Sequence, residues 1–253
     1  VRLAGVTDIK CSGDRTGSIN LTVTGGSPPY RYKWNNGDST QHVVNVPAGD
    51  YSVTVTDASG YHQTLSAKIA QPTPLQIKLD AVTNLLCFDD RKGAIGVTVT
   101  GGSMPYQYKW SSGQTTQDIA GIGAGSYTLN VIDASGCKSV VEAQVIQPDA
   151  FTVAVGEIRN LNCKGDNKGE IHLDVNGGVA PYTYNWSNGS RAKDITGGMA
   201  GKYTVKVSDS NGCLNSVDAT ITEPAELVAS VANVINNACF GESKGAVNLS
   251  VSG

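Results

Sequence analysis

The chain has 253 residues, a formal net charge of −3 at pH 7 and a sequence pI near 5.6. This acidic balance supplies no basic field for a nucleic acid, whose phosphates dominate binding. No apolar run approaches the roughly 20 residues of a membrane-spanning helix, and residues 1–3 do not begin a signal peptide. With 30 Gly, 3 His and 2 Met, the chain is rich in turn and strand residues, which disfavours a metabolic enzyme.

The sequence repeats with a period of 76 residues. One cysteine recurs four times, and 87 − 11, 163 − 87 and 239 − 163 all equal 76. A second cysteine recurs twice at the same spacing, as Cys137 and Cys213, and Gly-Gly pairs recur at 25–26, 101–102 and 177–178. A fixed period of this length is typical of tandem repeat architectures. Three copies and about a third of another are present, so we expect the natural array to be longer.

Four segments follow from this period. Residues 1–73, 74–149 and 150–225 form repeats 1, 2 and 3, and residues 226–253 begin a fourth. The boundaries fall at Gln71-Pro72, Gln147-Pro148 and Glu223-Pro224. Because proline fixes its own φ and restricts the residue before it, these very short linkers are predicted to be stiff.

Within a repeat the apolar residues alternate with a period of two, and clusters of Gly, Pro, Asn and Asp separate the runs. This pattern predicts strands and turns, and no segment shows a helical stripe. Six or seven short strands in 76 residues favour an all-β fold of tandem immunoglobulin-like antiparallel sandwiches. In repeat 2 the predicted strands are 75–86, 94–100, 106–110, 117–119, 127–132 and 140–146.

Parity assigns the aromatic side chains to the core. In repeat 2 the residues Tyr106, Tyr108 and Trp110 share one parity, whereas Gln107 and Lys109 have the other and are expected to face water. The predicted core aromatics of the three repeats are Tyr30, Trp34, Tyr51, Tyr106, Trp110, Tyr127, Tyr182, Trp186 and Tyr203.

The penultimate strand and the turn after it carry two further signals. Tyr127 follows Gly125 by two residues, in the manner of the tyrosine corner of such sandwiches. The sequence from Asp133 to Gly136 predicts a hairpin turn, because an Asp side chain caps its own turn and Gly adopts φ > 0. Residues 209–212 repeat this turn.

At these positions the pattern resembles the SprB-repeat family. Repeat 3 carries it as Cys163-Lys164-Gly165, Gly177-Gly178, residues 181–189 (PYTYNWSNG), residues 200–203 (AGKY) and residues 211–213 (NGC). The resemblance covers essentially the whole chain. Repeat 1 departs from the pattern at Tyr61, where a cysteine is expected.

The resemblance implies a role in a large cell-surface adhesin. The family consists of large surface adhesins of Bacteroidetes that are used in gliding motility and exported by the type IX system. The resemblance therefore implies an extracellular location associated with the outer membrane, with neighbouring repeats and the gliding and secretion machinery as partners. Two alternatives are a multivalent polysaccharide-binding module and an accessory array of a secreted enzyme.

The cysteine spacing allows several pairings. Pairing within repeats gives Cys87–Cys137 and Cys163–Cys213, and pairing across a linker gives Cys137–Cys163 and Cys213–Cys239. A third scheme joins the first cysteine of one repeat to the second of the next, as Cys11–Cys137 and Cys87–Cys213. In an immunoglobulin-like sandwich the two cysteines of one repeat lie at opposite ends, on the order of 20 Å apart, beyond the about 7 Å that a disulfide spans. This favours the third scheme, with the intra-repeat scheme and free thiols as alternatives.

No catalytic pattern and no cofactor is expected. The chain has no H-E-x-x-H, G-x-S-x-G or P-loop sequence, and none of its three histidines recurs at the repeat spacing. A recurrent pair of acidic turns leaves calcium as a weaker alternative, because Ca²⁺ takes six to eight oxygen ligands. The carboxylates concerned are Asp14, Asp90, Asp133, Asp166 and Asp209.

Overall fold

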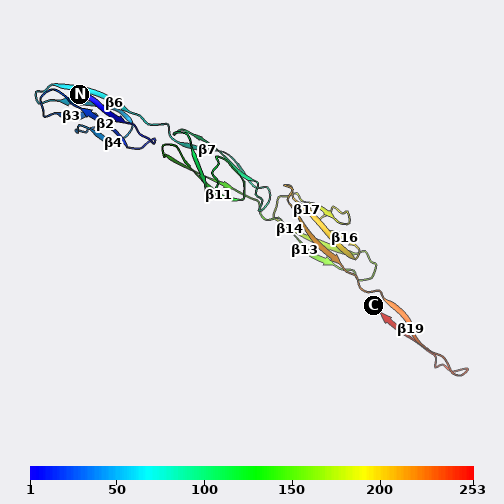
Figure 1. The fold of residues 1–253 in the computed structure, drawn as a ribbon. Coiled ribbons are helices and arrows are strands. Elements are labelled where there is room, and N and C mark those ends of the chain that lie inside the picture. Colours follow the sequence, from blue (N-terminus) through cyan, green and yellow to red (C-terminus); the bar gives the residue numbers. More distant parts are fainter. The chain divides into compact units, whose positions relative to one another are not determined.

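The structure, a computed structural model, describes residues 1–253 and contains twenty β-strands (Figure 1). No helix long and apolar enough to cross a membrane is present. The chain forms two compact units. The first consists of residues 1–84 and 91–146, and the second of residues 85–90 and 147–253. The short turn 85–90, which follows β7 (Gln76–Thr83) in the chain, therefore belongs to the second unit.

The first unit contains two sandwiches of six strands each. In the first sandwich, the sheets β1-β2-β4 and β3-β5-β6 are antiparallel throughout. Its strands are β1 (Arg2–Thr7), β2 (Gly17–Thr22), β3 (Arg31–Trp34), β4 (Val43–Val46), β5 (Gly49–Thr56) and β6 (His62–Ile69).

The second sandwich repeats this topology with the sheets β7-β8-β10 and β9-β11-β12. In its second sheet β11 is central, and Leu129 lies opposite Val141 on one side and Trp110 on the other. The strands are β7 (Gln76–Thr83), β8 (Gly93–Thr100), β9 (Gln107–Trp110), β10 (Ile119–Ile122), β11 (Gly125–Ile132) and β12 (Lys138–Val145).

The second unit contains a third sandwich, with the sheets β13-β14-β16 and β15-β17-β18, and a separate two-stranded hairpin. Its strands are β13 (Thr152–Arg159), β14 (Gly169–Asn176), β15 (Thr183–Trp186), β16 (Ile195–Gly198), β17 (Gly201–Ser208), β18 (Leu214–Ile221), β19 (Val228–Ile235) and β20 (Ala246–Ser252). All three sandwiches are therefore immunoglobulin-like, as the sequence predicts.

The core of each sandwich lies between its two sheets. In the first, Ile19 and Val43 come from one sheet and pack with Val53 and Ile69 from the other, and all four are at most 1% exposed. The tryptophans Trp34, Trp110 and Trp186 are 1–2% exposed. The indole N–H of each donates to a backbone carbonyl six residues later, at 2.8–3.0 Å. Each ring therefore buries its apolar body without leaving its polar group unpaired.

Two predicted strand limits were wrong. The predicted strand 117–119 lies at Ile119–Ile122 instead. Gln117 and Asp118 contact β8 through their side chains, with Gln117 Nε2 donating to the Val97 carbonyl at 2.6 Å and Asp118 Oδ1 accepting from the Val97 N–H at 2.9 Å. These side chains replace backbone pairing. The first strand ends at Thr83 rather than Leu86, because the chain turns there and buries Leu85.

Candidate functional site: the junction between repeats

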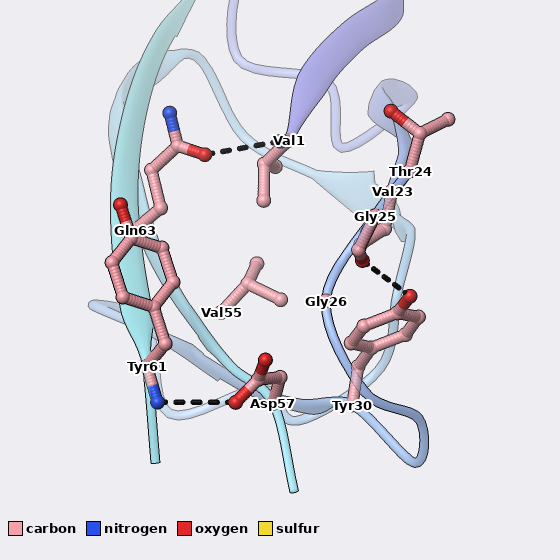
Figure 2. Close-up of a pocket in the computed structure, with 10 residues that line it drawn as sticks. All are labelled: Val1, Val23, Thr24, Gly25, Gly26, Tyr30, Val55, Asp57, Tyr61 and Gln63. Atoms are coloured by element: carbon pink, nitrogen blue, oxygen red, sulfur yellow. Dashed lines mark hydrogen bonds between the residues drawn. The ribbon is translucent and has the colours of Figure 1, made fainter. Parts of the chain in front are cut away.

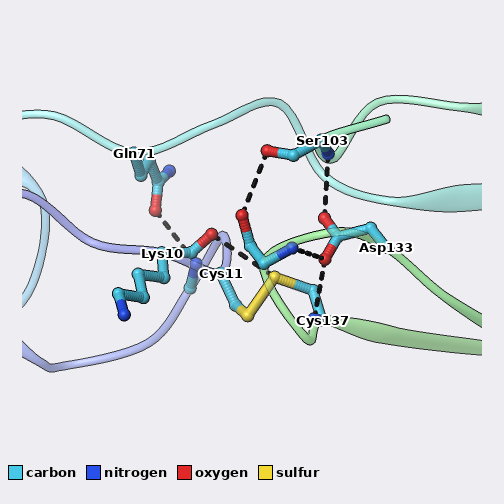
Figure 3. Close-up of a disulfide and its surroundings, with 8 residues drawn as sticks. Lys10, Cys11, Gln71, Ser103, Asp133 and Cys137 are labelled. Carbon is cyan, nitrogen blue, oxygen red and sulfur yellow. Dashed lines mark hydrogen bonds between the residues drawn. A yellow bond between two sulfur atoms is a disulfide. The ribbon is translucent and has the colours of Figure 1, made fainter. Parts of the chain in front are cut away.

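The first junction joins repeats 1 and 2 and lies wholly within the first unit. It consists of the turn between β1 and β2 (residues 8–16), the linker (residues 70–75) and the turn between β11 and β12 (residues 133–137). A disulfide joins Cys11 of the first turn to Cys137 of the second, with Cα atoms 5.4 Å apart (Figure 3). The bridge thus has the end-to-end pairing of the third scheme. In the chain-entropy account, a bridge between residues 126 positions apart stabilises the folded state by about 5 kcal/mol, because it restricts the unfolded chain.

Asp133 shapes the turn that presents Cys137. Its Oδ1 accepts from the backbone N–H of Ser135 at 2.9 Å and of Cys137 at 2.8 Å, and its Oδ2 accepts from the N–H of Ser103 at 2.9 Å (Figure 3). Burial raises the pKa of Asp133, but these backbone donors outweigh it and hold the pKa below its usual value. Asp133 is 4% exposed, so its carboxylate acts as a buried cap of the turn that contains Cys137.

The linker is held on both sides. Gln71 Oε1 accepts from the N–H of Gly13, in the cysteine turn of repeat 1, at 2.9 Å (Figure 3). Two residues later the Thr73 carbonyl accepts from the N–H of Gly102, in repeat 2, at 2.9 Å. Neither contact was predicted from the sequence. The Gln71 contact, which recurs at Gln147 and Glu223, explains why a residue with a side-chain carbonyl or carboxylate oxygen precedes the proline of every linker.

The Gly-Gly pair of repeat 2 makes room for the linker. A Cβ on Gly101 would lie 1.9 Å from the Pro74 carbonyl oxygen, and one on Gly102 would lie 2.6 Å from Asp133 Oδ2. Both glycines also have positive φ, +74° and +61°, a conformation that favours glycine. The linker backbone therefore lies directly on this pair.

The second junction has the same construction within the second unit. Cys87, in the turn 85–90, pairs with Cys213 with Cα atoms 5.6 Å apart. Gln147 Oε1 accepts from the N–H of Asp89 at 2.9 Å. Asp209 Oδ1 accepts from the N–H of Cys213 at 2.8 Å, which repeats the cap of the first junction.

The second junction also has a contact that the first lacks. Asn211 Nδ2 donates to the Leu86 carbonyl at 2.9 Å, beside the disulfide. The corresponding residue of the first junction is Ser135, whose hydroxyl instead donates to Ser103 Oγ at 3.1 Å.

Repeat 3 presents half of a further junction. Glu223 Oε2 accepts from the N–H of Gly165 at 2.7 Å, and Lys164 Nζ pairs with Glu226 Oε2 at 2.6 Å. Leu161 is buried and its N–H donates to the Thr222 carbonyl at 2.9 Å. Cys163 therefore lies in a turn with the same linker contacts as that of Cys11, but its thiol is free and exposed, as is that of Cys239.

The predicted core aromatics divide into two groups. The tryptophans and Tyr51 are buried, whereas the other tyrosines are partly buried against the cores. The hydroxyls of Tyr51, Tyr127 and Tyr203 donate to the backbone carbonyl four residues earlier, at 2.8–3.0 Å. This is the predicted tyrosine corner. The hydroxyls of Tyr30, Tyr106 and Tyr182 donate to the backbone carbonyl of the first glycine of the Gly-Gly pair in their own repeat, at 2.6–2.8 Å.

The acidic turn residues are engaged with the backbone. The N–H groups of Asp14, Asp90 and Asp166 donate to the carbonyl of the cysteine three residues earlier, at 3.1–3.4 Å. Asp133 and Asp209 cap the other turn, as described above. No three His, Cys, Asp or Glu side chains gather where a metal ion could be held. The role that the structure gives to Asp133 and Asp209 is turn formation.

Comparison with known proteins gives one family match, which recurs in each repeat. The family model of the SprB repeat matches residues 4–39, 79–115 and 155–191. No curated protein matches the chain in sequence. Among solved structures, three N-terminal domains of the bacteriophage RB49 outer capsid protein Hoc are 15% identical, with a TM-score of 0.39 and coverage of 88% of this chain and 100% of that one. The titin I-band fragment I67–I69 is 15% identical, with a TM-score of 0.40 and coverage of 88% and 98%. The three matched regions lie one in each of repeats 1, 2 and 3, so each repeat is similar to the SprB repeat over about half of its length.

Proposed function

We propose that this chain is a non-enzymatic segment of a large cell-surface adhesin, in which it forms a stiff stalk that holds adhesive regions away from the cell. One observation carries the proposal: at each of the two complete junctions, a disulfide and a hydrogen-bonded linker connect consecutive repeats. A sandwich domain that only had to fold would need neither.

The linker contacts supply the stiffness. Gln71 and Thr73 are two residues apart. Gln71 accepts a hydrogen bond from a backbone N–H of repeat 1, and Thr73 accepts one from a backbone N–H of repeat 2. The chain between them contains Pro72, whose φ is fixed. Together with the Cys11–Cys137 bridge, these contacts give each pair of repeats two separate attachments. Bending at the junction would require the linker contacts to break, because the bridge prevents the turns from separating.

The disulfides also support an extracellular location. Structural disulfides form and persist in oxidising compartments and are rare in the cytosol. Attachment to the outer membrane, export by the type IX system and a part in gliding motility are suggested by the SprB repeats. In this proposal the repeats act through their length and number, since each copy extends the array by a fixed increment.

We propose that the segment works without a bound cofactor. Two of the five carboxylates considered for calcium, those of Asp133 and Asp209, already accept hydrogen bonds from backbone N–H groups. Binding a cation would have to displace these bonds. An unchanged melting temperature after addition of a chelator is expected, and a clear drop would contradict this part of the proposal.

Small-angle scattering on the oxidised chain tests the stalk directly. At about 35–40 Å per sandwich, from strand length plus loops, we expect a maximum dimension of about 120 Å and the profile of a stiff particle. The matched control replaces both cysteines of the first junction, Cys11→Ser and Cys137→Ser, and we expect it to show a more flexible profile. A collapsed oxidised chain, or one as flexible as the control, would contradict the proposal.

A further inference from the structure

The two disulfides overlap along the chain. The loop closed by Cys11–Cys137 contains Cys87, and the loop closed by Cys87–Cys213 contains Cys137. Each bridge joins residues 126 positions apart. Because the loops share residues 87–137, the bridges make one continuous covalent ladder instead of two separate rings.

Three stretches of backbone connect the two bridges in parallel. They are residues 11–87, 87–137 and 137–213, and each begins at one bridge and ends at the other. The middle stretch has 137 − 87 = 50 residues, whereas the outer two have 87 − 11 = 76 and 213 − 137 = 76. Under tension, the shortest covalent route becomes taut first and sets the maximum length.

We infer that this ladder limits how far the array extends under load, a mechanical function that rests on the proposed stalk role. At about 3.4 Å per fully extended residue, the 50-residue route reaches about 170 Å. Without bridges, the 213 − 11 = 202 residues from Cys11 to Cys213 would reach about 690 Å. Even if every sandwich unfolds, the two 76-residue stretches stay slack, so the array cannot be drawn out into a long chain.

Single-molecule pulling from tags at the two ends of the full chain tests this inference. The oxidised chain is compared with a variant lacking the first bridge (Cys11→Ser, Cys137→Ser), one lacking the second (Cys87→Ser, Cys213→Ser) and one lacking both. Loss of either bridge opens a 76-residue route, so both single-bridge variants are expected to lengthen by the same about 90 Å. Loss of both is expected to add about 520 Å. Contour length is read on the extended chain, so variants that fold poorly remain informative.

Two results would overturn the ladder. Pairing within repeats would leave a route of 102 residues, which is (87 − 11) + (163 − 137), and the oxidised chain would then be about 180 Å longer than expected. An oxidised chain as long as the variant without bridges would mean that no ladder forms. The outcome is separate from that of the scattering experiment, because a chain with flexible junctions still has the same covalent limit.

A second feature, independent of the disulfides, is a pocket at one end of the first sandwich. It lies between the Gly25-Gly26 pair with Tyr30 on one side and Tyr61 with Gln63 on the other, with Val55 among its lining residues (Figure 2). Tyr61 stands where repeats 2 and 3 have a bridged cysteine, and it is 73% exposed.

In the other two repeats an apolar side chain of the preceding linker occupies the equivalent position. A Cβ on Gly102 would lie 3.2 Å from Leu75 Cδ1, and one on Gly178 would lie 2.9 Å from Phe151 Cδ2. The Phe151 ring stacks on Tyr182 with ring centroids 5.7 Å apart. In repeat 1, the three atoms nearest to such a Cβ on Gly26 all belong to Asp57.

The linker backbone shows the same difference between repeat 1 and the other two repeats. A Cβ on Gly101 or Gly177 would lie 1.9 Å from the carbonyl oxygen of Pro74 or Ala150, whereas one on Gly25 would meet nothing within 4 Å. Gly25 nevertheless has φ +77°, close to the +74° of Gly101. The surface that receives a linker is therefore formed in repeat 1, and it is open.

We propose that this pocket seats the linker of a further repeat: an extended segment whose carbonyl oxygen lies over Gly25 and whose Leu or Phe side chain packs against Tyr30. This proposal deepens the stalk role and rests on it. Because Tyr61 offers no thiol, the seat holds its linker without a covalent bridge. The joint at repeat 1 can therefore open under load, whereas the two bridged junctions cannot separate.

The test is a chain with a copy of residues 74–152 fused directly before Val1. This fusion puts the copied Phe151 two residues ahead of Val1, as Phe151 stands two residues ahead of Val153. We expect the Gly26 amide to become protected from hydrogen exchange to the level of Gly102, which donates to the Thr73 carbonyl. The controls change the copied Phe151 to Ser, or Gly25 to Ala, and are expected to lose that protection.

A Tyr61→Cys form of the fused chain adds a covalent readout. With oxidised glutathione as the oxidant, the new thiol and the copied Cys87 are expected to form a disulfide, while the oxidant takes up their two electrons and two protons to give two glutathione thiols. A Gly26 amide that exchanges at the rate seen without the fusion would overturn the proposal, whatever the yield of this bridge. Stiff scattering from the original chain would be unaffected by such a failure.

Discussion

Cys11 and Cys137 stand 126 positions apart in the sequence, and their Cα atoms lie 5.4 Å apart across the boundary between two repeats. Cys87 and Cys213 have the same separation, and their Cα atoms lie 5.6 Å apart. The recurrence of both spacings shows that the junction, and not only the sandwich, is part of the repeating unit. The function we propose follows from this property, because a repeated junction sets the geometry of an array.

Removal of a turn cap is expected to destabilise the repeat that contains it. Asp209→Ala leaves the backbone N–H groups of Asn211, Cys213 and Val179 without their carboxylate acceptor. We expect a loss of about 2 kcal/mol or more in the free energy of unfolding, measured by chemical denaturation. Asp209→Asn keeps a side-chain oxygen and is expected to lose less. Equal losses for the two variants would mean that the carboxylate does not act as the cap.

Acid is expected to weaken the corresponding turns of repeats 1 and 2, which contain Asp57 and Asp133. The Ser59 hydroxyl is the main cause that lowers the pKa of Asp57, and at Asp133 backbone donors outweigh burial. A lowered pKa in the folded state contributes stability that is present above the unfolded value, about 3.9, and lost as the pH falls through the folded pKa. The melting temperature should therefore change little from pH 7 to about 5 and fall below about pH 4. Asp133→Asn should make that fall shallower, and an unchanged slope would contradict the assignment.

The tyrosine corner is expected to contribute a modest stabilisation. Tyr127→Phe removes the hydrogen bond from the Tyr127 hydroxyl to the Gly123 carbonyl, which is 3.0 Å long, and keeps the ring. We expect a loss of about 1 kcal/mol in the free energy of unfolding. Tyr61→Phe is the matched control at an exposed position and should change stability by less than about 0.5 kcal/mol. A control that costs as much as Tyr127→Phe would remove this explanation.

A comparison of two glycines isolates the contribution of the linker. Gly25 and Gly101 have nearly equal positive φ, so an Ala at either costs about 1 kcal/mol through the backbone. Only Gly101→Ala would also meet the Pro74 carbonyl, at 1.9 Å. We expect Gly101→Ala to be more destabilising than Gly25→Ala by at least about 1 kcal/mol in thermal or chemical unfolding. Equal effects would show that the linker does not rest on Gly101.

Much of the fold could be predicted because the period of two survives in every repeat. Leu129 and Val131 share a parity with Tyr127, and both are fully buried. The turn at Asp133 was likewise predictable, since a short Asp-x-x-Gly sequence determines it locally, and Gly136 has φ +86°. The tyrosine corner depends on a spacing of only four residues, so the sequence carries that signal as well.

The contacts of the linker were not predictable in the same way. The bond from Gly13 to Gln71 joins residues 58 positions apart, and no periodicity links their types. Only a comparison of the repeats reveals a sequence signal for this contact. A residue with an oxygen-bearing side chain precedes the proline of each linker, namely Gln71, Gln147 and Glu223. The predicted position of the strand at Ile119–Ile122 was wrong for a similar reason. Gln117 and Asp118 bond to β8 through their side chains, and parity alone cannot distinguish such contacts from the backbone pairing of a strand.

Peptide mapping of the unreduced chain by mass spectrometry tests the central claim most directly. If consecutive repeats are bridged end to end, the map contains peptides that join Cys11 to Cys137 and Cys87 to Cys213, and it shows Cys163 and Cys239 as free thiols. Peptides that join Cys87 to Cys137 and Cys163 to Cys213 would place each bridge inside one repeat, and they would contradict both the covalent junction and the ladder.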